Sequence, residues 1–69
     1  MVPPGKRVKV INLRGGSGMV ARLMQMGIHP GAIIEIVENS RGPILVRVRG
    51  VVIALGRGIA RKIVVMPQL

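Results

Sequence analysis

Residues 44–55 read ILVRVRGVVIAL and predict a β-hairpin. The first strand of the hairpin is expected from Ile44 to Arg49, and its alternation places Ile44, Val46 and Val48 on the inward face. Gly50 supplies a tight turn into a second strand, Val51 to Leu55. The chain holds eleven Val and nine Ile residues, whose β-branched side chains fit a pleated sheet. The hairpin and the composition together predict a mostly β protein.

Three further stretches on either side of the hairpin have the pattern of strands: Lys6 to Leu13, Ala32 to Glu38 and Lys62 to Met66. Simple alternation in the first places Asn12 on the same face as Val8 and Val10. Residues 39–43 are turn formers, and Gly56 to Ala60 form either a loop or a single helical turn. The chain is therefore expected to contain about five short strands.

One short helix is expected after the first strand, which ends at Gly15-Gly16. Ser17 is the candidate N-terminal cap, and Gly27 is the candidate left-handed residue that ends the helix. Pro30-Gly31 then predicts a tight turn. The apolar stripe of the helix comprises Met19, Val20, Leu23, Met24 and Met26. Five strands joined by tight turns, with one inserted helix, indicate a small closed barrel or half-barrel.

With 69 residues and no cysteine, the chain forms one domain, 1–69, without disulfides. A closed zinc site is also unexpected, because only His29, Glu35 and Glu38 could serve as ligands. Self-association stays open as a source of stability. The longest clean apolar run, Val51 to Leu55, is too short to span a bilayer, and no secretory signal is visible. We therefore expect a cytoplasmic protein without membrane insertion.

Catalysis is not expected. The chain has no Asp, Cys or Tyr and a single His, so no nucleophile, base and orienting group can be assembled convincingly. Glu35 and Glu38, three residues apart on a strand, are expected to face opposite sides. Residues 16–21 match the G-x-G-x-x-A pattern of dinucleotide sites, but the hairpins that follow do not fit the repeated βα units of that fold. A turn and a helix start explain the same residues.

The net charge of +9 is the strongest general indication of a partner, because Lys and Arg attract phosphates and acidic surfaces alike. A nucleic-acid-binding barrel is therefore one hypothesis, and a merely solvated basic surface is an equal alternative. The absence of aromatic residues counts against single-strand binding, which relies on base stacking. The candidate basic patch comprises Arg47, Arg49, Arg57, Arg61 and Lys62.

Residues 22–31, RLMQMGIHPG, begin a pattern that resembles the FeoA family from about Gly5 to Met66. The pattern continues through Ile34-Glu35-Ile36, Gly42-Pro43-Ile44, Val48-Arg49-Gly50, Ile53-Ala54-Leu55, Ala60 and Ile63-Val64-Val65. The resemblance implies an SH3-like barrel without enzymatic activity or cofactor, a cytosolic accessory of ferrous iron uptake. Its implied partner is a FeoB-type membrane transporter with a GTPase domain. Transition-metal binding would rest on this resemblance alone.

A similar domain also occurs at the C-terminus of iron-dependent transcriptional repressors. This gives a second alternative, an SH3-like regulatory module linked to iron-dependent transcription. Because no winged-helix segment precedes Gly5, a complete repressor is not expected. For the transporter hypothesis, the candidate contact surface is the helix and its exit: Arg22, Leu23, Met24, Met26 and Ile28. Leu23 and Ile28 could equally belong to the core.

Overall fold

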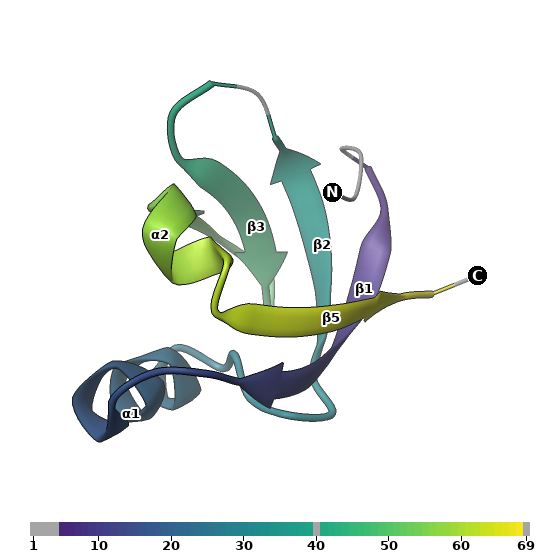
Figure 1. Ribbon diagram of the computed structural model, residues 1–69. Coiled ribbons are helices and arrows are strands. Elements are labelled where there is room, and N and C mark those ends of the chain that lie inside the picture. The colour runs from purple at the N-terminus through teal and green to yellow at the C-terminus, as the bar shows by residue number, and fades with distance from the viewer. Residues whose placement is uncertain (1–4, 40, 69) are drawn as a thin grey trace.

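A computed structural model describes residues 5–39 and 41–68 of the chain. Its elements follow in the order expected, with one short helix after the first strand and a single helical turn before the last strand (Figure 1). Their bounds are β1 Arg7–Leu13, α1 Ser17–Gln25, β2 Ile33–Glu38, β3 Ile44–Val48, β4 Val51–Leu55, α2 Arg57–Ala60 and β5 Ile63–Pro67.

The five strands form one sheet in the order β4-β3-β2-β1-β5, and every pair in it is antiparallel. The sheet curls so that β5 crosses over the strands in the middle of the sheet (Figure 1). No ladder joins β4 to β5 in the described part of the chain, so the curled sheet stays open at these two edges. Of the two forms that the sequence allows, the protein adopts the half-barrel, and an SH3-like fold is consistent with this arrangement.

The core lies inside the curl of the sheet and is entirely aliphatic. Alternate residues of each strand supply it, as the period of two predicts. Leu23 of α1 and Ile28, just beyond the helix, close the core from one end. The buried residues from the sheet are Val8, Val10, Ile34, Ile36, Ile44, Val46, Val48 and Leu55.

A bulge interrupts the alternation of β1. In the ladder with β5, Val10 pairs with Val65 but Asn12 pairs with Val64, so Ile11 is an extra residue. Asn12 is consequently exposed, and its Oδ1 accepts a hydrogen bond from the Leu13 N–H at 2.9 Å. Leu13 packs against the core instead. The prediction that Asn12 shares the inner face is wrong, because alternation alone gives no sign of a bulge.

Helix α1 ends as the sequence predicts and begins differently. Gly27 has φ +91°, and the Ile28 N–H donates to the Leu23 carbonyl at 3.0 Å, which is the closing bond of a Schellman motif. The N-cap is Gly16, and no side chain caps the first turn. Ser17 is already the first helical residue, so its predicted role as the cap is wrong.

The β3–β4 hairpin turns over two residues, Arg49 and Gly50. Both have positive φ, +54° and +79°, as a type I′ turn requires. Val48 pairs with Val51 directly before and after the turn. The expected turn at Gly50 is confirmed, but Arg49 belongs to the turn rather than to the strand.

Candidate functional site

The predicted contact surface on α1 is divided between the core and the solvent. Leu23 is only 2% exposed and Ile28 is fully buried, so these two side chains cannot reach a partner in this fold. Met24 is 49% exposed and Arg22 is also exposed, whereas Met26 is half-buried against the core. The structure therefore decides the open question for Leu23 and Ile28 in favour of the core. It leaves Arg22, Met24 and part of Met26 on the surface.

The five residues of the candidate basic patch lie in different settings. Arg47 projects from β3 and forms an ion pair with Glu35 on β2, with Nη1 and Oε1 2.8 Å apart. Arg49 sits in the β3–β4 turn, close to Gly27 at the end of α1. Arg57, Arg61 and Lys62 belong to α2 and the residues just after it. The cations therefore do not form one strip along β3, and the only acidic side chain opposite Arg47 already neutralises it.

We expect the Arg47–Glu35 pair to contribute little to stability. Both side chains are well exposed, 44% and 35%, and exposed pairs typically give about 0.2–1 kcal/mol. A double-mutant cycle with Arg47→Gln and Glu35→Gln, followed by urea unfolding, measures this coupling, which should shrink further in 1 M salt. A coupling above about 2 kcal/mol would contradict the exposed geometry.

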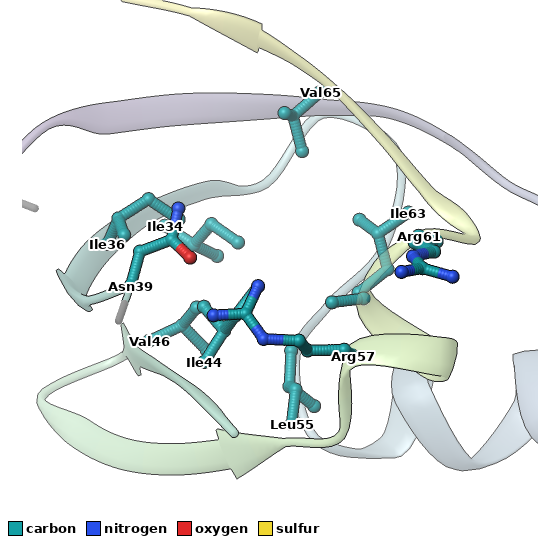
Figure 2. A pocket seen from close by; sticks show the side chains of 11 residues that line it. Ile34, Ile36, Asn39, Ile44, Val46, Leu55, Arg57, Arg61, Ile63 and Val65 are labelled. Carbon is teal, nitrogen blue, oxygen red and sulfur yellow. The ribbon is translucent and has the colours of Figure 1, made fainter. Parts of the chain in front are cut away.

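An apolar cavity of about 290 Å³ opens between the edges of the half-barrel (Figure 2). Ile34, Val46 and Leu55 form its floor, and Ile63 and Val65 of β5 form the opposite wall. The protein has no aromatic ring that could fill this space.

Three polar side chains also line this cavity, those of Asn39, Arg57 and Arg61. The Arg57 side chain extends from α2 into the space (Figure 2). The rest of the lining comprises Ile36, Ile44 and Ala60. Among the described residues that line the cavity there is no carboxylate or histidine. The geometry suits binding of an apolar group near a positive charge. The sequence analysis identified both arginines as part of a basic patch but missed the cavity, because no local pattern reveals where a curled sheet stays open.

The residues weighed as metal ligands are dispersed. The described part of the chain contains no group of three or more His, Cys, Asp or Glu side chains. His29 lies in a turn, with its Nδ1 3.0 Å from the carbonyl oxygen of Pro30, and Glu35 is engaged by Arg47. Residues 16–21 do connect a strand to a helix, but the sheet is antiparallel throughout, so the parallel βαβ unit of a dinucleotide site does not form. Neither helix in residues 5–39 and 41–68 has the length and apolar character needed to cross a membrane.

Comparison with known proteins gives a consistent result. The model of the FeoA domain family matches residues 1–67. A protein from Methanocaldococcus jannaschii that is named as an Fe(2+) transport protein A is 39% identical over 61 residues. The match covers 88% of this chain and 74% of that protein.

Solved structures agree with the sequence matches. A crystal structure of an iron uptake regulatory protein (FeoA) superposes with a TM-score of 0.87 and 39% identity, covering 97% of this chain and 89% of the other. A solution structure of a FeoA-like protein from Clostridium acetobutylicum has a TM-score of 0.83 and 33% sequence identity. The match covers 99% of this chain and 81% of the other. The FeoA protein from Chlorobium tepidum, at 24% identity and a TM-score of 0.88, covers 99% and 67% and shares the fold.

Proposed function

The chain belongs to the FeoA domain family, and on this premise we propose that it is a cytoplasmic accessory protein of ferrous iron transport that binds a FeoB-type membrane transporter. The family match over residues 1–67 is the observation that carries the proposal. Further support comes from the 39% identical relative that is named for Fe(2+) transport. In this proposal the chain acts by contact rather than by chemistry, since the described lining of its cavity does not bring an acid, a base and a nucleophile together.

The exposed part of α1 is the proposed contact surface. Met24 offers an unbranched, adaptable apolar side chain at 49% exposure, and Arg22, also exposed on α1, offers a positive charge. The helix packs on the core through Leu23, so the opposite side remains available to another protein. A partner that suits this surface presents an apolar groove with an acidic rim, and the charge of +9 would speed its association.

Substitution of Met24 by Glu tests this contact. We expect Met24→Glu to weaken binding to the full-length transporter in nanodiscs by about tenfold or more, because it places a charge in an apolar contact. The matched control is Met66→Glu, since Met66 is equally exposed at 53% but lies on β5. Isothermal titration measures both, with empty nanodiscs subtracted because anionic lipid attracts a basic protein.

Two results would argue against the proposal. If the wild type shows no saturable heat with the transporter beyond that of empty nanodiscs, the accessory contact is not made by this chain. If the protein binds duplex DNA instead, with an affinity that falls steeply with salt, the result would support the alternative hypothesis of a basic nucleic-acid-binding protein. If Met24→Glu and Met66→Glu weaken binding to the transporter equally, the transporter would remain the partner, but the contact surface would not be on α1.

A further inference from the structure

Strand β4 is an edge of the sheet, and its backbone is paired on one side only. In the described part of the chain, its ladder runs to β3 through five consecutive pairs without a bulge. The backbone hydrogen bonds outside helices and ladders involve no residue from Val51 to Leu55. β4 is therefore a straight, regular strand with one vacant hydrogen-bonding edge.

The hairpin geometry identifies which groups occupy that edge. Val48 and Val51 close a two-residue turn, so they exchange hydrogen bonds with each other. Hydrogen-bonded and non-bonded pairs then alternate along an antiparallel ladder. The backbone N–H and C=O groups of Ile53 and Leu55 consequently point toward β3. Those of Val52 and Ala54 point away from the sheet, toward the vacant edge.

This edge has none of the usual protective features. Natural edge strands carry charges, prolines or bulges that prevent pairing with another chain. Residues 51–55, VVIAL, contain no charge and no proline, and Val51 and Val52 are 61% and 49% exposed. The opposite edge, β5, ends in Pro67 and pairs with β1 through a bulge. The contrast indicates that β4 is kept open for another strand.

The charges around β4 distinguish between possible occupants. Residues 39–69 contain no acidic side chain, while Arg49 precedes β4 and Arg57 follows it. A symmetric dimer paired through Val52 and Ala54 would bring two chains of +9 together, so electrostatic repulsion opposes a second copy as the occupant.

We propose that β4 accepts an extended segment of another protein, apolar in its middle and acidic at both ends, as an added antiparallel strand. Backbone hydrogen bonds to Val52 and Ala54 supply the register, and the net charge of +9, with no acidic side chain in residues 39–69, favours an acidic segment. This surface is separate from Met24 on α1. The inference therefore stands or falls independently of the transporter contact.

Amide hydrogen exchange by NMR tests the proposal directly. In the free protein, the Val52 and Ala54 amides should exchange quickly, and those of Val51, Ile53 and Leu55 slowly. An excess of the probe peptide EVTVTVE should slow exchange at Val52 and Ala54 by about tenfold without changing the other three amides. The control peptide KVTVTVK has the same backbone and β-propensity and should leave all five unchanged.

A pair of variants separates backbone pairing from side-chain contact. Val52→Pro removes an outward N–H but no bond to β3, and should abolish the protection of Ala54 by EVTVTVE. Val52→Thr keeps the backbone and the branched shape, and should preserve that protection. Slow exchange at Ile53 reports that each variant is folded.

Three outcomes would overturn the proposal. The first is an absence of protection at Val52 and Ala54 with EVTVTVE on the wild type. The second is equal protection by EVTVTVE and KVTVTVK, which would show that the edge does not select acidic segments. The third is protection that appears without peptide and rises with protein concentration, which would make a second copy the occupant.

Discussion

Leu23→Ala is expected to lower the free energy of unfolding by about 2–5 kcal/mol, the range for truncating a fully buried leucine. Leu23 is 2% exposed and is among the largest fully buried side chains of the protein. It is also the only buried residue that α1 itself contributes to the described core. A domain of this size is stable by roughly 3–10 kcal/mol, so the loss removes a large share of the total. Much of the population should be unfolded near 37 °C.

Urea unfolding followed by far-ultraviolet circular dichroism measures this effect. Met24→Ala is the matched control, because it truncates the next residue of the same helix, whose side chain is 49% exposed. It should change the free energy of unfolding by less than about 1 kcal/mol. Similar losses in the two variants would mean that the helix does not present Leu23 to the core.

Gly27→Ala is expected to cost about 2–4 kcal/mol, from backbone strain and crowding together. Gly27 has φ +91°, where an L-residue is strained. A Cβ at this position would lie 3.0 Å from Val48 Cγ1 and 3.2 Å from Arg49 Nε. Because Val48 is buried in the core, it can move aside only by disturbing other core residues.

Gly31→Ala separates the two causes. Gly31 has the same φ of +91°, but a Cβ there would meet no heavy atom within 4 Å. This variant should lose only the strain, about 1–2 kcal/mol. Thermal unfolding of both variants gives the difference, which reports the contact between the end of α1 and β3. Equal losses would contradict that contact.

Short-range patterns predicted much of the fold correctly. The hairpin of residues 44–55 was recognisable because alternation and a turn residue act within a few positions. Gly27 marked the end of α1 because only glycine adopts a left-handed conformation readily. The family resemblance was also readable at this level, since its motifs consist mainly of turn and core residues at fixed spacing.

Two local predictions failed by one residue each. Asn12 and Ser17 were assigned by position in a regular element, but a bulge displaces the first and the helix begins one residue earlier than the cap assignment required. The bulge at Asn12 depends on the register in which β1 pairs with β5 and packs on the core. That information lies in β5 and the core, far along the chain.

At the candidate site, the sequence identified the residue types, but only the tertiary structure showed which of them are exposed. The sequence identified the apolar stripe of α1, but only packing against the sheet separated buried Leu23 from exposed Met24. It identified Arg57 and Arg61 as cations, but only the open half-barrel placed them beside an apolar cavity.

The sequence by itself determined the strand and helix order, the turns, the all-aliphatic core and the family, because these follow from periodicity, special backbone conformations and composition. The tertiary structure alone decided that the barrel stays open, that a cavity forms at its unfilled end and that β4 is a bare edge. These features depend on how five strands of limited side-chain volume curl around one core, which is a property of all strands together.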